Sequence, residues 1–130
     1  MKNPSDLKYN TEHEWVKPDQ GGSATVGITH HAQDSMGEIT YVELPEIGKE
    51  VEKGHHLFSI SSAKAFMDLL SPISGDVIEV NEELETNPKA VNESPYRKGW
   101  IVKLRMSQPG ELDTLMGNIA YEEFVIRETT

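Results

Sequence analysis

The sequence contains no cysteine, which excludes disulfide bonds, thiolate metal sites and a cysteine nucleophile. Basic residues are also few, because 12 lysines and arginines stand against 22 acids and give a formal net charge of −10. Phosphate binding requires clustered lysine and arginine, so this balance predicts no nucleic-acid partner. An acidic surface instead favours solubility and attraction to basic patches on partner proteins.

Long apolar runs are missing as well. No stretch approaches the roughly 18 residues that a membrane span requires, so no membrane association is expected. Residues 1–10 lack the apolar core of a signal peptide and are not rich in arginine, which predicts a cytoplasmic protein. Hydrophobic residues make up 36% of the 130 residues. That share predicts a small core in a single domain spanning residues 1–130.

Short alternating segments, punctuated by glycine and proline, fill most of the chain. Strands are predicted at 15–17, 23–28, 38–44, 50–52, 57–61, 69–71, 76–80 and 100–106. Thr29 is predicted to cap a helix that ends at Gly37, and shorter helical pieces are predicted at 111–116 and 119–126. The polar segment 81–98 predicts a long surface loop with at most one helical turn. Together these features predict a mainly β barrel or sandwich.

Lys64 lies between two similar halves of the central region. Segment 48–57 reads Gly-x-x-Val-x-x-Gly-x-x-Leu before one strand, and segment 71–77 reads Ser-Pro-Ile-Ser-Gly-Asp-Val as it enters another. Two strand pairs joined by a tight turn would place Lys64 at an exposed tip, where the small Ala63 and Ala65 leave its amine accessible. A lysine stem is long and flexible, so acylation of its amine would create an extended tether. Such a tether raises the local concentration of a carried group at each partner.

Several further segments, in a fixed order and spacing, carry a more specific signal. They are Tyr9, 13–16, 24–29, 31–33, 41–45, Gly48, 71–75, 80–81, 91–92, 94–96 and 99–100. By these segments, over about residues 7–124, the chain resembles the H protein of the glycine cleavage system, a family of lipoyl carriers. The resemblance implies a barrel-sandwich hybrid of two small antiparallel sheets with short helices, like other lipoyl and biotinyl carriers. It also implies a monomeric carrier that is not itself an enzyme and has no catalytic residues.

The family attaches lipoic acid to the lysine of a turn that reads Glu-Ser-Val-Lys-Ala. Here the same place is Ser61 to Ala65, so the lysine and the alanine match while Ser61 replaces an acid that assists recognition by the ligase. Phe66 and Met67 are bulkier than the residues usual after the lysine. The resemblance implies that a lipoate ligase or lipoyl transferase attaches the lipoyl group to Lys64.

The resemblance also implies the partners. The carrier would receive an aminomethyl group from glycine decarboxylase, pass the one-carbon unit to a tetrahydrofolate-dependent aminomethyltransferase, and be reoxidised by dihydrolipoyl dehydrogenase. The loaded arm of family members rests in a surface cleft, where a protonated amine requires a carboxylate partner. Glu14 and Asp68 match positions that line this cleft, and Glu12 lies nearby in the sequence. We therefore expect Glu14 and Asp68 to hold the methylammonium group.

Three alternatives remain open. An H-like lipoyl carrier of another pathway, such as sulfur oxidation or lipoyl relay, is supported by Ser61, Phe66 and Met67. A biotin carrier usually has methionines on both sides of the lysine, where this chain has alanines. A structural domain would leave Lys64 unmodified.

The histidines suggest no metal site from their sequence positions. Residues 30–31 and 55–56 are histidine pairs, but adjacent side chains on a strand or turn point in opposite directions and no third ligand is suggestively spaced. His13 is not accompanied by a nucleophile, which favours a structural hydrogen-bonding role over that of a general base.

Overall fold

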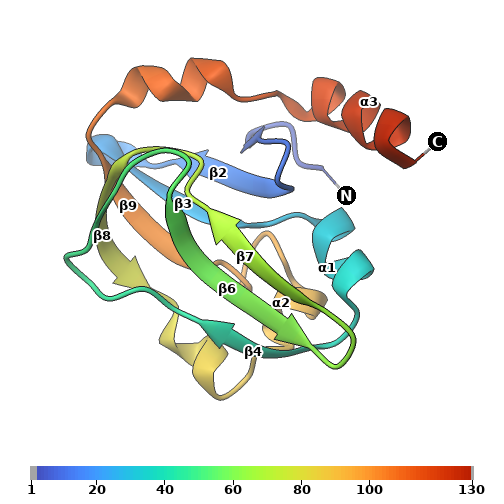
Figure 1. Cartoon of the computed structure of the whole chain (residues 1–130). Helices are drawn as coiled ribbons and strands as arrows, with labels where there is room; N and C mark the ends of the chain where they lie inside the picture. The colour runs from blue at the N-terminus through green and yellow to red at the C-terminus, as the bar shows by residue number, and fades with distance from the viewer. Residues whose placement is uncertain (1–2, 130) are drawn as a thin grey trace.

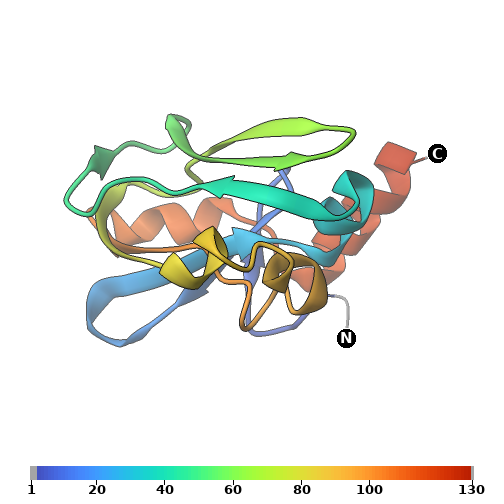
Figure 2. The ribbon, with the colours of Figure 1, turned by 90° about the horizontal axis from the view of Figure 1, so that it is seen from below.

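The computed structural model describes residues 3–129, whose strands form two antiparallel sheets. Six strands in the order β1-β2-β3-β9-β8-β5 form one sheet, and β4-β6-β7 form the other. The strands are β1 Lys8–Tyr9, β2 Glu14–Pro18, β3 Ser23–Ile28, β4 Ile39–Glu43, β5 Glu50–Val51, β6 His56–Ser62, β7 Phe66–Leu70, β8 Gly75–Val80 and β9 Val102–Met106. Figures 1 and 2 show two facing layers, which confirms the predicted mainly β barrel-sandwich hybrid.

Alternation along the strands builds the core between the two layers. Val26 of β3, Val42 of β4, Ile60 of β6 and Leu104 of β9 are each at most 2% exposed. Burying a side chain of this size stabilises the fold by roughly 1.5–3 kcal/mol. A second, smaller cluster contains Leu7, Tyr9, Trp15 and Tyr121.

Helices close the ends of the two layers. They are α1 His30–Met36, α2 Ala90–Glu93 and α3 Asn118–Thr129, with 3₁₀ helices η1 Gln20–Gly22, η2 Glu82–Glu85 and η3 Pro109–Thr114. The prediction for α1 is confirmed, because Thr29 Oγ1 accepts the backbone N–H of Ala32 at 3.2 Å and Gly37, with φ 79°, ends the helix. In α3, Tyr121 stacks on Tyr9 with ring centroids 4.8 Å apart. Within residues 3–129, no helix is long and apolar enough to cross a membrane.

The segment 81–98 differs from the predicted surface loop. It contains η2 and α2, and its Leu84 and Val91 are at most 1% exposed in the main core. The polar composition of the segment concealed these contacts, because they are made with residues distant in the sequence.

Asn92 of α2 joins the end of α1 to the start of β4. Its Nδ2 donates hydrogen bonds to Gln33 Oε1 at 2.9 Å and to the Gly37 carbonyl at 2.8 Å. Its Oδ1 accepts the backbone N–H of Ile39 at 2.8 Å. One side chain therefore satisfies two backbone groups that the turn between α1 and β4 leaves without partners.

Replacing Asn92 should destabilise this corner. We expect Asn92→Ala to lower the free energy of unfolding by about 1–3 kcal/mol, because the Ile39 N–H and the Gly37 carbonyl lose their partner. Urea unfolding followed by circular dichroism measures the change. Asn87→Ala, at an exposed position nearby, is the matched control, and equal effects of the two substitutions would contradict the role given to Asn92.

Candidate functional site

Lys64 lies at the tip of the hairpin formed by β6 and β7. Ser61 is paired with Phe66 at the end of the ladder, and the turn closes where the Ser62 N–H donates to the Ala65 carbonyl at 2.9 Å. The Lys64 side chain is exposed, and both views of the ribbon place this tip beside α1 (Figures 1 and 2). The structure thus has the strand–turn–strand geometry that the sequence predicts around the lysine.

The stem of Lys64 lies against the glycine that ends α1. A Cβ on Gly37 would stand 3.2 Å from Lys64 Cε, and the φ of Gly37 is 79°. A positive φ favours glycine, and a larger residue would also crowd the lysine stem. Glycine at position 37 therefore lets the end of α1 lie close to the hairpin tip without displacing the side chain of Lys64.

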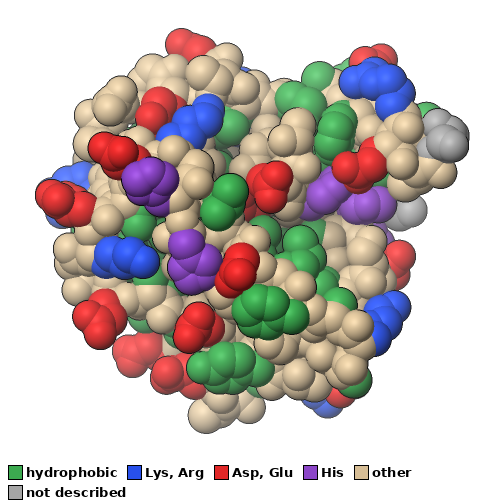
Figure 3. All heavy atoms as spheres, in the orientation of Figure 1, with side chains coloured by type: hydrophobic (Ala, Val, Ile, Leu, Met, Phe, Trp, Pro, Cys, Tyr) green, Lys and Arg blue, Asp and Glu red, His purple; other side chains and the backbone are tan. Residues whose placement is uncertain are grey.

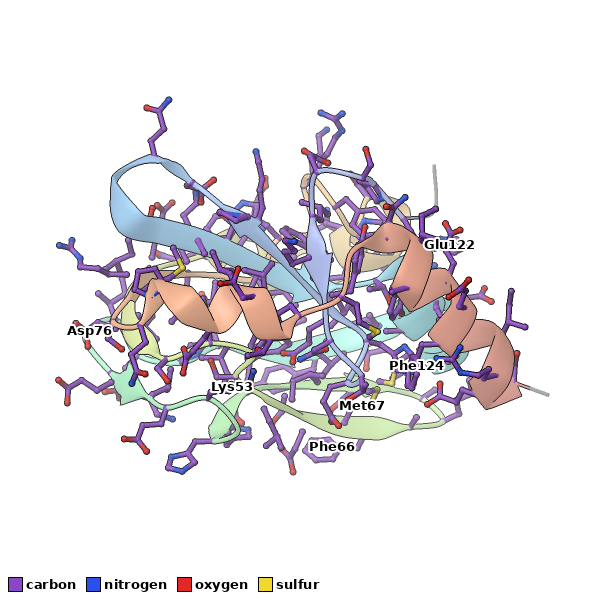
Figure 4. All side chains as sticks on the ribbon, turned by 90° about the horizontal axis from the view of Figure 1, so that it is seen from above. Lys53, Phe66, Met67, Asp76, Glu122 and Phe124 are labelled. Atoms are coloured by element: carbon purple, nitrogen blue, oxygen red, sulfur yellow. The ribbon has the colours of Figure 1, made fainter. Side chains whose placement is uncertain are left out.

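An apolar row crosses the outer face of the three-stranded sheet beside the tip. Tyr41 is paired with Ser61, and Ser61 with Phe66, so the three side chains share one face. Tyr41 is 56% and Phe66 62% exposed, and hydrophobic side chains stand over these strands in Figure 3. Met67 points to the opposite face of β7 from Phe66 (Figure 4) and packs against the core. Ser61 thus lies between two exposed aromatic residues.

Glu14, the first residue of β2, is fully buried. Asn10 Nδ2 donates to Glu14 Oε1 at 2.9 Å, while Oε2 has no hydrogen-bond partner among the described residues. Burial raises the pKa of Glu14 well above its usual range; the hydrogen bond from Asn10 opposes the rise, and the charge of Glu12 adds to it. An unpartnered buried polar atom costs roughly 1–3 kcal/mol. This oxygen is therefore an acceptor without a partner, at a position closed to solvent.

His13, which precedes Glu14, has a left-handed backbone with φ 65°. That conformation is uncommon outside glycine and costs on the order of 1–3 kcal/mol. Its ring is held by α3: Nδ1 lies 2.7 Å from Tyr121 Oη, and Nε2 lies 2.8 Å from Glu128 Oε1. The predicted structural hydrogen-bonding role of His13 is confirmed by these contacts. They fix the turn that leads into Glu14.

Glu12 lines a cleft of about 250 Å³ between the N-terminal segment and the end of β7. Asn10, which is hydrogen bonded to Glu14, lines the same cleft, together with the apolar residues Leu70, Pro72 and Met116. The cleft therefore combines apolar walls with the carboxylate of Glu12 and the ammonium of Lys53, and its apolar walls suit a ligand with a hydrocarbon body.

Glu14 and Asp68, which the sequence predicted to line the cleft, are not among its lining residues, whereas Glu12 is. Asp68 lies apart from both other acids. It lies midway along β7, where its Oδ1 accepts from Ser59 Oγ at 2.6 Å and lies 3.3 Å from His56 Nε2. Glu12, in contrast, is close enough for its charge to raise the pKa of Glu14. The structure brings Glu12 and Glu14 together and engages Asp68 with β6.

Two residues of this region were not singled out from the sequence. Asn10 pairs with Glu14 across a short turn, and no periodicity marks such a contact. Ser59 is buried beneath Asp68. Side chains alternate along β6, so Ser59 lies on the same face as Ser61. This alternation is visible in the sequence and predicts the position of Ser59.

The comparisons with known proteins decide the family. A family model described as "Glycine cleavage H-protein" matches residues 7–128. The chain belongs to the glycine cleavage H-protein family. It is 50% identical over 123 residues to "Glycine cleavage system H protein 2, mitochondrial" of Arabidopsis thaliana. The aligned residues cover 95% of this chain and 78% of that protein. It is 47% identical to the glycine cleavage system H protein of Staphylococcus haemolyticus, over 96% of this chain and 98% of that protein.

The likeness to the H-protein family extends to the fold. The crystal structure of a glycine cleavage system H protein from Mycobacterium marinum superposes with a TM-score of 0.76 at 33% identity. The match covers 80% of this chain and 86% of that chain. Sequence and structure therefore agree on the H-protein family.

The raised pKa of Glu14 predicts how stability depends on pH. The folded state holds the Glu14 proton more tightly than the unfolded state, whose pKa is about 4.3. The resulting stabilisation is fully present below the unfolded pKa and is lost as pH rises toward the folded pKa. Glu14→Gln has no such proton, so its stability relative to the wild type should increase with pH. Urea unfolding from about pH 4 to pH 8 measures this difference. If the free energies of unfolding of the wild type and of Glu14→Gln change equally with pH, burial does not raise the pKa of Glu14.

Proposed function

We propose that this protein is the lipoyl carrier of the glycine cleavage system, with lipoic acid joined to Lys64 through an amide bond. The observation that supports this most strongly is the exposed Lys64 at a hairpin tip within a chain of the H-protein family. When bound, the lipoyl group supplies the sulfur chemistry that accepts and releases an aminomethyl group. Residues 1–130 act as one domain that positions and protects the group as a non-catalytic subunit.

The residues of the cleft suit the loaded arm. Leu70, Pro72 and Met116 would hold its hydrocarbon part, since they provide apolar walls. β7 separates the tip from this cleft by five residues, or about 16 Å along the strand, which an acylated lysine has to bridge. As the edge strand of its sheet, β7 leaves one side open along that path.

Glu14 would hold the cationic end of the arm. Its Oε2 is buried and has no partner within residues 3–129, so it can accept a hydrogen bond without losing another. A protonated amine beside it would favour the ionised carboxylate and offset the cost of its burial. We assign Glu12 and Asp68 to the same task, at the wall of the cleft and on β7.

The proposed partners follow from the family and from charge. Glycine decarboxylase, the aminomethyltransferase and dihydrolipoyl dehydrogenase would each receive the arm, and a lipoate ligase or lipoyl transferase would attach it. A net charge of −10 favours basic docking surfaces on these enzymes. We propose that the carrier acts as a monomer in the cytoplasm. A relative of similar sequence comes from the bacterium Staphylococcus haemolyticus, whereas the name of the Arabidopsis relative gives it as mitochondrial.

One observation favours a second candidate, an H-like lipoyl carrier of another lipoate-dependent pathway. Ser61 replaces the acid of the family turn and lies between the exposed rings of Tyr41 and Phe66. An enzyme that contacts the tip therefore meets an apolar row in place of an acid. Transfer assays of the lipoylated protein with enzymes of each pathway distinguish the two candidates.

Modification of Lys64 is tested by intact mass. Coexpression with a lipoate ligase and excess lipoate should add the mass of one lipoyl group to the wild type and to Lys49→Arg, an exposed control. Lys64→Arg should remain unmodified, because its guanidinium does not accept the acyl group. Wild-type protein that stays unmodified, or a Lys64→Arg variant that is modified, would overturn the proposal.

The role of Glu14 is tested on the loaded protein. Glu14→Gln should release formaldehyde about tenfold faster or more, since a hydrogen bond to a charged group contributes about 1.5–3 kcal/mol. Glu79→Gln, at an exposed position on β8, should release it at the wild-type rate. If Glu14→Gln and the wild type release formaldehyde equally fast, Glu14 does not hold the amine.

A further inference from the structure

A second group of polar side chains meets outside the cleft, where three elements converge. His13 precedes β2, His31 belongs to α1 and Glu128 belongs to α3, and one ligand atom from each lies within 4.8 Å of the others. Figure 3 shows histidine side chains gathered beneath α3 with an acidic side chain beside them. Sequence positions alone do not reveal this group, because His13 and Glu128 are 115 residues apart.

The separations within the group suit a small metal ion. His13 Nε2 lies 2.8 Å from Glu128 Oε1, and the rings of His13 and His31 have centroids 4.7 Å apart at an angle of 40°. Around a tetrahedral zinc ion with bonds of about 2.1 Å, neighbouring ligand atoms lie about 3.4 Å apart. Small side-chain rotations would therefore bring the three atoms to this spacing. Glu128 is 44% exposed and is free to make such a rotation at the surface.

The surroundings of the His31 ring disfavour its protonated form. Burial lowers the pKa of His31, as does the neighbouring His13, while the charges of Glu128 and Asp34 act in the opposite direction. Metals bind imidazole only when the ligating nitrogen carries no proton. The place of His31 among the ligands rests on its position, since its ligand atom lies within 4.8 Å of those of His13 and Glu128.

Tyr121 provides the support that a metal-binding histidine requires. Its Oη lies 2.7 Å from His13 Nδ1 and 2.8 Å from Thr29 Oγ1. Burial raises the pKa of Tyr121 to about 12, so the phenol keeps its proton and can donate it to Thr29 while accepting the Nδ1–H of His13. Hydrogen bonding at one ring nitrogen fixes the tautomer that leaves the other free for a metal. Nε2, which lies 2.8 Å from Glu128 Oε1 and can donate to it in the metal-free protein, would give up that proton and become the ligand when zinc binds.

We propose that His13, His31 and Glu128 form a zinc-binding site with a fourth position open to water. Two imidazoles and a carboxylate are a ligand set that zinc accepts, and the net charge of −10 favours cation binding. The bound ion would join α3 to α1 and to the turn before β2. It would also fix the backbone of His13, the residue next to Glu14, although the site does not depend on lipoylation of Lys64.

Calorimetric titration tests the site directly. Zinc chloride is added to tag-free, metal-depleted, unlipoylated full chain. The wild type should bind one equivalent, and His31→Ala and Glu128→Gln should each weaken binding at least tenfold, with folding checked by circular dichroism. His55→Ala is the matched control, because His55 lies 4.0 Å from Glu52 in an exposed pair that has no third ligand among residues 3–129. It should bind zinc like the wild type.

Two outcomes of the titration overturn the proposal. One is the absence of binding by the wild type; the other is equal binding by the wild type, His31→Ala and Glu128→Gln. Hydrogen exchange adds a readout of position, since zinc should slow amide exchange in α3 of the wild type and not of Glu128→Gln. If zinc binds but exchange in α3 is unchanged, the ion is held elsewhere and the assignment is wrong.

Discussion

The antiparallel pairing of β6 with both β4 and β7 is the constraint on which presentation of Lys64 depends. β6 is the central strand of its sheet, and its inward Phe58 and Ile60 are fully buried. Because side chains alternate with a period of two, a slip of β6 by one residue would move Phe58 and Ile60 from the core face of the sheet to its outer face. The register that fills the core therefore also fixes the residues at the tip. A flexible tether is useful only if its attachment point is held in this way.

Two unfavourable features adjoin one another at the start of β2. His13 has a left-handed backbone, and Glu14 is buried with one unpartnered oxygen among the described residues. Contacts from Tyr121 and Glu128 of α3 hold His13 in place and offset part of that cost. Strain and unpaired polar atoms persist where function selects for them. The arrangement accords with a carboxylate kept ready for a cationic ligand.

Local signals made part of this structure predictable from the sequence. Thr29 and Gly37 define α1 because capping depends on a few adjacent residues, and the alternation of strand residues follows from burial of one face. Long-range packing was not predictable in this way. The polar segment 81–98 hides both its buried residues and the three hydrogen bonds of Asn92. The same limit applies to the site, since Lys64 stands in a local turn pattern whereas the burial of Glu14 depends on distant elements.

The central claim is that Lys64 carries a group between the enzymes of glycine cleavage. It is tested most directly by reconstitution with glycine decarboxylase, the aminomethyltransferase and dihydrolipoyl dehydrogenase, with release of ammonia from glycine as the measure. The account predicts turnover that requires the lipoylated wild type and is absent with Lys64→Arg. Turnover supported by the lipoylated H protein of Staphylococcus haemolyticus, but not by this lipoylated protein in the same mixture, would contradict it.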